Sequence, residues 1–165
     1  MRVVAILETM WDWRSMTSGA GRREAPRYFR VNSQNHSGRR LYKLVGPEAD
    51  LLVTNACREL VSHARKHGKP DPVWLGENLL ILDGAGTVLW QRQFGMNSQI
   101  DVLLVCGKIA QRTYKECDYQ PRGARVIEIP HPAARGCWSR EAIAEVAGRI
   151  QNNHGAHAVT ANNEN

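Results

Sequence analysis

The segment His131–Arg135 combines a titratable ring, a rigid proline, two small side chains and a guanidinium. It follows the apolar run Arg125–Ile129 and precedes a helix that we predict from Ser139. Imidazole changes charge near neutral pH, so it can donate or accept a proton there. Open α/β sheets bind their ligands at loops that follow the carboxyl ends of strands. The pattern therefore predicts chemistry in this loop, with a plain turn as the alternative.

Further polar groups follow two other apolar runs. Glu8 and Asp12 come after Val3–Leu7, and Asn55 follows Leu51–Val53. A carboxylate can hold a water molecule or stabilise a cation, and an amide offers both a donor and an acceptor. The alternatives are equally good: the two acids can be solvated loop residues, and Asn55 can cap a helix.

Four short apolar runs are typical of parallel strands that are buried on both faces. They are Arg2–Leu7, Asp50–Thr54, Asp101–Cys106 and Arg125–Ile129. Helical periodicity or helix-end signals mark the stretches Ser37–Val45, Asn55–Gly68, Lys108–Glu116 and Ser139–Ile150. This alternation predicts a single α/β domain over residues 1–150, a three-layer α/β/α sandwich with a mainly parallel four-stranded sheet.

The remaining segments carry weaker signals. Residues 28–31 can form a short extended piece, and residues 69–72 are a predicted linker. Residues 73–99 fit either a hairpin, with strands at Leu79–Leu82 and Thr87–Trp90, or a broken helix. Residues 151–165 are rich in Asn and Ala without periodicity, so we expect a disordered C-terminal tail.

Composition indicates one globular protein. The chain has 165 residues, of which 42% are hydrophobic and 23% charged, as in soluble domains. No apolar run approaches the ~20 residues of a membrane span, and the first residues do not resemble a signal peptide. The four cysteines form no C-x-x-C pair and are expected to be reduced thiols. We therefore expect a cytoplasmic monomer with no membrane partner, no metal and no cofactor.

Positive charge is concentrated in one part of the chain. Residues 14–43 contain eight Lys or Arg and a single acid, Glu24, for a net charge of +7, whereas the whole chain carries +6. A localised positive field suits a polyanion such as DNA. Tyr28, Phe29 and Asn32 lie within the segment and add stacking and base-edge groups. A solvated basic loop is the alternative.

The order of the strand ends resembles the uracil-DNA glycosylase superfamily over most of residues 3–150. In that family a first strand enters a polar loop that holds the water-positioning residue, and a later strand ends in an asparagine, as Leu52–Asn55 does. A hydrophobic strand then meets a glycine and a helix, as in Leu103–Ala110, and the last strand enters a His-Pro-Ser loop, which His131–Arg135 resembles. The helix start Ser37–Leu41 is also similar.

The resemblance implies a monofunctional DNA N-glycosylase, which turns a base out of double-stranded DNA and hydrolyses its N-glycosidic bond. The implied catalytic residues are Asp12 or Glu8 for the water, His131 for the departing base and Asn55 for the base edge. The residues implied for holding the base are Trp11, Trp13, Tyr28, Phe29 and Asn32. Those implied for contacting DNA are Arg22, Arg23, Arg39, Arg40, Lys108, Ala133, Ala134 and Arg135.

Two departures from the family bear on the target base. The first loop, Leu7–Trp13, lacks the usual glycine and proline, and Ala133 stands where the family has serine. Two tryptophans with polar neighbours suit a base larger than uracil. Some bacterial glycosylases that resemble this superfamily excise glucosylated hydroxymethylcytosine from phage DNA, so we expect a bulky modified pyrimidine and a role in defence.

Three alternatives stay open. One is a repair glycosylase for uracil or mismatched thymine. Another is an α/β enzyme for free nucleosides, against which the +7 segment argues because a neutral monomer needs no basic surface. The third is a DNA-binding protein without catalysis, which the altered first loop favours.

Overall fold

A mostly parallel sheet of five strands forms the centre of the protein in a computed structural model, which describes residues 1–9, 24–31, 34–60, 68–84 and 99–152. The strands are β1 (Arg2–Leu7), β2 (Phe29–Arg30), β3 (Asp50–Asn55), β4 (Val102–Cys106) and β5 (Arg125–Ile129), in the order β2-β3-β1-β4-β5. The strands β3, β1, β4 and β5 run parallel, as the apolar runs predicted. Strand β2 is an additional antiparallel edge strand within the extended piece expected at residues 28–31.

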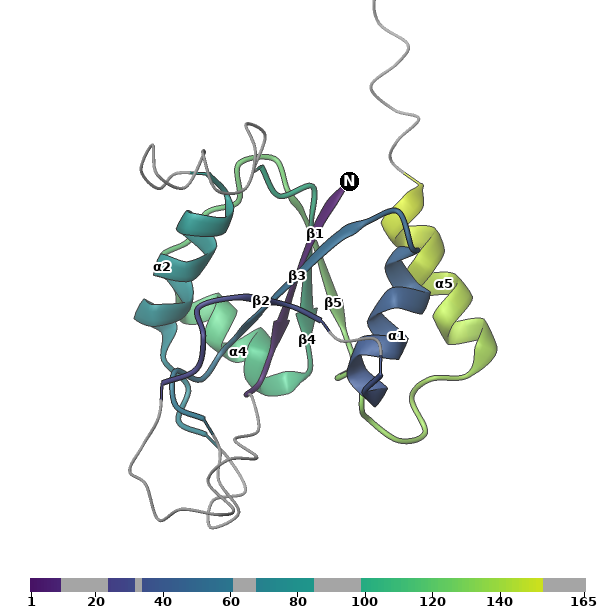
Figure 1. Cartoon of the computed structure of the whole chain (residues 1–165), viewed down its shortest axis with the longest axis horizontal. Coiled ribbons are helices and arrows are strands. Elements are labelled where there is room, and N and C mark those ends of the chain that lie inside the picture. The colour runs from purple at the N-terminus through teal and green to yellow at the C-terminus, as the bar shows by residue number, and fades with distance from the viewer. Residues whose placement is uncertain (10–23, 32–33, 61–67, 85–98, 153–165) are drawn as a thin grey trace, which may run out of the picture.

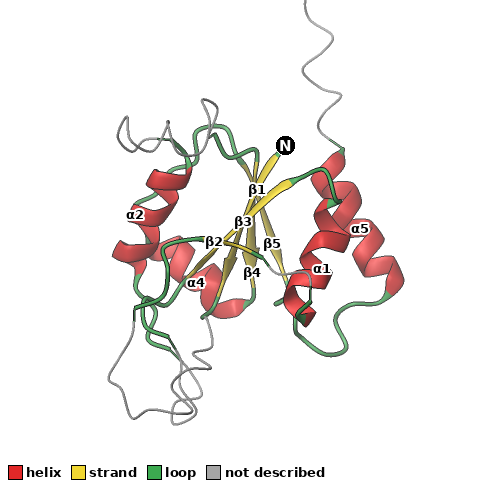
Figure 2. Cartoon of the chain, viewed as in Figure 1, coloured by secondary structure: helices red, strands yellow, loops and turns green. Residues whose placement is uncertain are grey.

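Four helices in the described residues cover the two faces of the sheet (Figure 1, Figure 2). One face packs against α1 (His36–Val45) and α5 (Arg140–Gln151), and the other against α2 (Pro72–Leu82) and α4 (Lys108–Glu116). Strand β1 lies at the middle, and Val3 to Ile6 are fully buried. The three-layer α/β/α arrangement predicted from the sequence is therefore confirmed, with one strand more than expected.

The helix predicted for Asn55–Gly68 is wrong in its described part. Residues 56–60 are not helical; Cys57 forms an isolated bridge with Pro70, and Glu59 forms one with Glu24. The Cys57 amide donates to the Glu8 carbonyl. The helical spacing of the apolar residues is thus outweighed by backbone pairing with neighbouring segments, because the bridge to Pro70 buries Cys57 without a helix. Residues 61–67 lie outside the described residues.

Helix α2 replaces the predicted linker at Pro72 and the hairpin strand at Leu79–Leu82. Asp71 caps it by accepting from the Trp74 amide. Because apolar residues occur on several sides of this helix, from buried Leu75 to exposed Val73, the sequence shows no amphipathic stripe. The broken-helix alternative holds for this part, whereas Thr87–Trp90 lies outside the described residues.

The other predicted helices are confirmed within one or two residues. Asn35 caps α1 by accepting from the Gly38 amide, and Ser139 caps α5 by accepting from the Ala142 amide. Most of the predicted tail, residues 153–165, lies outside the described residues, and Gln151 still belongs to α5. Within the described ranges, no helix has the length and apolar character that crossing a membrane requires.

A buried carboxylate fastens the end of α2 to the sheet. Asp83 is 5% exposed and accepts from the Ile100 amide and the Tyr119 hydroxyl, both at 3.1 Å. Burial, followed by the charge of Asp83, raises the pKa of Tyr119, so the phenol keeps its proton and donates. The carboxylate therefore satisfies two donors that have no access to water.

We expect Asp83→Ala to lower the free energy of unfolding by about 2–4 kcal/mol, because two buried donors lose their acceptor. Urea denaturation measures the change. Glu116→Ala removes an exposed acid from α4 and is the matched control, with an expected effect of about 0.5 kcal/mol or less. Equal effects of the two substitutions would contradict this role of Asp83.

Candidate functional site

The carboxyl ends of the four parallel strands meet at one edge of the sheet. Glu8 follows β1, Asn55 ends β3 beside Leu7, Gly107 follows β4, and His131 lies two residues beyond β5. Such an edge is where open α/β sheets bind ligands. The structure thus gathers three of the four catalytic residues implied by the sequence, Glu8, Asn55 and His131, whereas Asp12 lies outside the described residues.

Asn55 is a fully buried polar residue with no hydrogen-bonding partner among the described residues. Its side chain is 0% exposed, and neither the Oδ1 nor the Nδ2 atom bonds to any described residue. The predicted helix cap is wrong, because residues 56–60 are not helical and Asn55 Oδ1 accepts no hydrogen bond from the described residues. Burying an amide without compensation costs free energy. A buried donor and acceptor with no described partner, at an edge where such sheets bind ligands, makes Asn55 a candidate for ligand recognition.

The alternation of side chains along β3 puts Asn55 on the same face as Val53, which belongs to the core under α1 and α5. Ile129, at the end of β5, packs into the same core. Asn55 and the start of the His131 loop are therefore on one side of the sheet. Three strand spacings, roughly 14 Å, separate β3 from β5. Glu8 follows β1, which lies between these two strands in the sheet.

Gly107 allows the last loop to approach the neighbouring strand end. It has a φ of +87°, and a Cβ atom there would come within 3.1 Å of the His131 Cβ. Its amide donates to the Ile129 carbonyl at 2.8 Å. A side chain at this position would displace His131, so the glycine after β4 sets the place of the imidazole.

His131 is held in one neutral form. The Ala133 amide donates to His131 Nδ1 at 3.1 Å, so the proton of the neutral ring is on Nε2. Burial lowers the pKa of His131, and the negative charge of Glu8 opposes this in part. A second proton on Nδ1 would also face the Ala133 N–H. At neutral pH the ring therefore presents an Nε2–H donor rather than a cation.

The negative charge of Glu8 affects the pKa of two other residues. Its charge raises the pKa of His131, and it adds to the burial that raises the pKa of Cys57 to about 12. Cys57 is therefore an uncharged thiol packed against Gly68 and beneath the strand ends.

We expect His131 to titrate below 6.5, the ordinary pKa of histidine. Glu8→Gln removes the charge that favours the imidazolium, so the pKa of His131 should fall further. Two-dimensional NMR of the His131 ring protons measures both values. Glu48→Gln, at the opposite edge of the sheet beside Met1 and Asp101, should leave the titration unchanged. A pKa above 6.5, or a rise in Glu8→Gln, would contradict this account of the site.

Helix α1 and Trp138 fix the backbone of the His131 loop. Arg40 Nη1 donates to the Pro132 carbonyl at 2.6 Å, and the Arg40 guanidinium lies over the Trp138 ring, 5.7 Å from its centre. Trp138 Nε1 donates to the His131 carbonyl at 3.0 Å, and the Ala134 amide donates to that carbonyl as well. Arg40, assigned from the sequence to DNA contact, therefore has a positioning contact; Trp138 was missed, because a lone tryptophan before a helix carries no signal.

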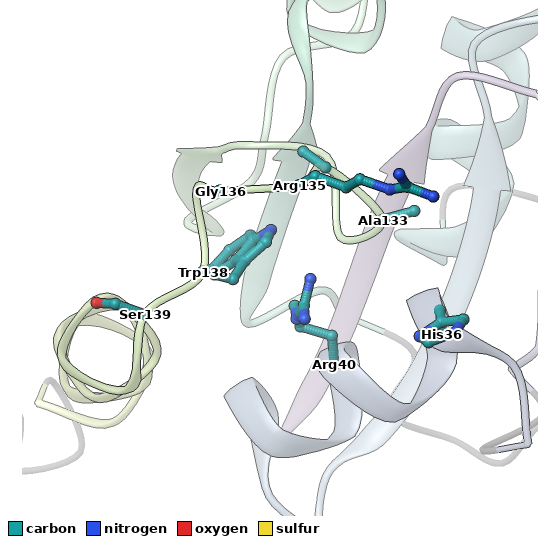
Figure 3. Close-up of a pocket in the computed structure, with 8 residues that line it drawn as sticks. His36, Arg40, Ala133, Arg135, Gly136, Trp138 and Ser139 are labelled. Atoms are coloured by element: carbon teal, nitrogen blue, oxygen red, sulfur yellow. The ribbon is translucent and has the colours of Figure 1, made fainter.

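A groove of about 660 Å³ lies between this loop and α1. Figure 3 shows Arg40, Trp138 and Ala133 around it, with His36 at the start of α1 and Ser139 at the start of α5. The imidazole of His131 does not line it. The loop therefore has two sides, one towards Glu8 and the strand ends, the other towards the groove.

The other predicted site residues have varied positions. Phe29 and Tyr28 are partly buried and pack against the two cores, so both contribute to folding. Arg39 is exposed on α1, and Lys108 is exposed at the start of α4, beside the site edge. Trp11, Asp12, Trp13, Arg22, Arg23 and Asn32 lie outside the described residues.

Across the described ranges, His, Cys, Asp and Glu side chains form no cluster of three that could hold a metal ion. In comparisons with models of protein families and with curated proteins, nothing matches this chain. A functional assignment therefore depends on the chemistry of the site itself.

Proposed function

We propose that the protein is a DNA N-glycosylase of the uracil-DNA glycosylase type that releases a modified pyrimidine and leaves an abasic site. The observation that carries the proposal is the buried amide of Asn55, which has no partner among the described residues, at the same sheet edge as the neutral imidazole of His131. The resemblance of the strand-end motifs to that superfamily supports it. So does the parallel order β3-β1-β4-β5, which brings these motifs together.

The amide of Asn55 matches the edge of a pyrimidine. Uracil offers a carbonyl acceptor beside an N–H donor, and cytosine offers an amino donor beside a ring-nitrogen acceptor. One asparagine amide complements either edge after rotating its oxygen and nitrogen. Asn55 can therefore pair with either kind of pyrimidine edge, and the remaining pocket must exclude other bases and distinguish among pyrimidines. A base bound there would also satisfy the two buried atoms of the amide.

His131 and Glu8 have complementary tasks in breaking the glycosidic bond. As the bond lengthens, negative charge builds on the base and positive charge on the deoxyribose. The Nε2–H of His131 donates to the base carbonyl, and it does so without carrying a charge of its own. The carboxylate of Glu8 holds the attacking water and stabilises the sugar cation. Asp12, the alternative carboxylate, lies outside the described residues.

The test is single-turnover incubation with duplex oligonucleotides, followed by alkaline cleavage of abasic sites. The panel contains uracil, a G·T mismatch, hydroxymethylcytosine and glucosylated hydroxymethylcytosine, each at one position. We expect a cut at a modified cytosine, and a rate of cutting about 10²–10³-fold lower with His131→Ala. A cut at uracil or the mismatch alone would assign a repair role instead. Duplex binding without any cut would favour the non-catalytic alternative, and release from free nucleosides would favour the nucleosidase.

A further inference from the structure

Helix α2 has apolar side chains on the side that faces away from the sheet. Within the described residues three large apolar side chains are exposed, and two of them are Val73 and Leu80. Val73 is 73% exposed and Leu80 is 44% exposed. Because they are seven residues apart, they lie on one face of the helix, roughly 10 Å from each other. The core beneath α2 uses Leu75, Leu79 and Leu82 instead, so the exposed pair is not needed for packing against the sheet.

A groove lies between this face of α2 and the end of α4, on the side of the sheet opposite α1 and α5 (Figure 1). Val73, Gly76 and Leu80 line one wall, and residues 116–119 line the other. Gly76 is buried, and a Cβ atom there would contact the Cys117 Cβ at 3.7 Å, so the missing side chain leaves the floor open. The volume of about 200 Å³ is below the roughly 300 Å³ at which small-molecule sites begin. The groove therefore suits one or two apolar side chains of a polypeptide.

The charged side chains that line the groove are all acids, Glu77, Glu116 and Asp118. Glu77 is paired with Arg27, whose Nη1 lies 3.2 Å from the Glu77 Oε2. Glu116 and Asp118 are exposed, and neither forms an ion pair with a described residue. Since the whole chain carries a charge of +6, the groove has the opposite sign to the protein as a whole.

Charge decides which occupant fits the apolar pair. A second copy of this chain, docked by the same face, would bring its own acids against these acids, and like charges in contact repel. A nucleic acid would meet the same repulsion. An amphipathic helix that lays its apolar face into a groove is a recurrent mode of recognition, and lysine or arginine beside that face complements the acids here.

We propose that this groove docks a basic amphipathic helix of a partner protein. Its apolar side chains contact Val73 and Leu80, and its cations contact Glu116 and Asp118. The proposal is independent of the proposed function, because it involves none of the residues at the carboxyl ends of the strands.

The experiment measures binding of the full chain to two labelled synthetic peptides by fluorescence anisotropy. Each has about 18 residues of leucine and lysine in the same numbers. In the first, leucine recurs at i, i+3, i+4 and i+7 and forms one apolar face; in the second, the order is scrambled and no such face forms. A chain of charge +6 repels both at long range, so binding requires a local site. We expect the first peptide to bind at least about 10-fold more tightly than the second.

A pair of matched variants tests the apolar contact. Val73→Ser should weaken binding of the first peptide by about 5–10-fold, because an apolar side chain that the peptide covers is lost. Val126→Ser makes the same change at an exposed position of β5 and should leave the affinity unchanged. Both variants should keep the unfolding midpoint in urea, since surface substitutions of this kind have small effects.

A second pair tests the charge. Glu116→Gln combined with Asp118→Asn should weaken binding by about 3–10-fold and make it less sensitive to salt. Glu48→Gln combined with Glu145→Gln removes two exposed acids elsewhere and should change neither quantity.

The proposal is overturned if the first peptide does not bind, if both peptides bind equally, or if a variant and its control lose affinity equally. Analytical ultracentrifugation tests the second copy as occupant: a dimer that Val73→Ser dissociates would assign the groove to self-association instead. An unfolding midpoint that falls much more in Val73→Ser than in Val126→Ser would show that another part of this chain covers the groove, which also overturns the proposal. Base release from the oligonucleotide panel enters none of these outcomes, so each proposal can fail alone.

Discussion

Replacing Asn55 with leucine is expected to stabilise the protein while abolishing release of the base. Leucine has nearly the shape of asparagine but no polar atoms. In the folded protein the amide of Asn55 is fully buried and bonds to none of the described residues. Removing it therefore removes an uncompensated desolvation cost, worth about 1–3 kcal/mol. The same change leaves the base edge without its donor and acceptor.

The expected loss of base release is about 10³-fold or more, because a site that hydrogen-bonds its substrate discriminates strongly against a missing partner. Single-turnover cleavage of the best oligonucleotide measures this loss, and urea denaturation measures stability. A substitution that gains stability and loses activity is typical of a residue kept for function. If Asn55→Leu instead lowers stability and leaves activity intact, the amide has a structural role and recognition lies elsewhere.

Thr54 provides the control for Asn55, because it is an adjacent, fully buried polar residue whose partners are all in place. Its hydroxyl donates to the Arg27 carbonyl at 2.7 Å and accepts from Asn78 Nδ2 at 3.3 Å. Thr54→Val should therefore lower the free energy of unfolding by about 1–3 kcal/mol and leave the single-turnover rate of the folded protein unchanged. If Asn55→Leu raises the free energy of unfolding while Thr54→Val lowers it, the gain cannot come from a general benefit of removing polar side chains from this strand.

The parallel strands were predictable because their residues are buried on both faces. Continuous apolar runs such as Val3–Leu7 and Val102–Cys106 are short and rich in β-branched residues, which is typical of strands buried on both faces. Helices α1 and α5 were predictable because their end signals and apolar stripes agree. Once the strands run parallel, their carboxyl ends must lie at one edge of the sheet. The sequence therefore predicts that Glu8, Asn55 and His131 lie at the same edge.

Features that depend on tertiary pairing were not predictable. The helical spacing of Cys57 and Leu60 predicted a helix that residues 56–60 do not form, since pairing of Cys57 with Pro70 outweighs a local preference. The predicted helix also gave Asn55 a role as its cap, so the sequence did not indicate that the Asn55 side chain lacks a hydrogen-bonding partner among the described residues. The positioning of the His131 loop by Arg40 and Trp138 joins residues about a hundred positions apart, and no local pattern marks it.

Replacing His131 with alanine is expected to slow base release by about 10²–10³-fold, the usual cost of removing one donor that stabilises a developing anion. The fixed tautomer makes a sharper test possible. Glutamine can place an N–H near the position of Nε2, but it cannot take or give up a proton at neutral pH. We therefore expect His131→Gln to retain more activity than His131→Ala, measured by single-turnover cleavage.

The pH profile distinguishes hydrogen-bond donation from proton transfer at His131. If the neutral ring is the active form, the rate falls as pH drops through the lowered pKa of His131, because the imidazolium loses the Ala133 contact that orients the ring. That acidic limb should disappear in His131→Gln, since an amide does not titrate there. Should His131→Gln be as inactive as His131→Ala, the ring would act by moving a proton, and its task would be that of an acid. The neutral state fixed by Ala133 favours hydrogen-bond donation over proton transfer. A ring that keeps its Nε2 proton stabilises the departing base and does not need to be reprotonated before the next reaction.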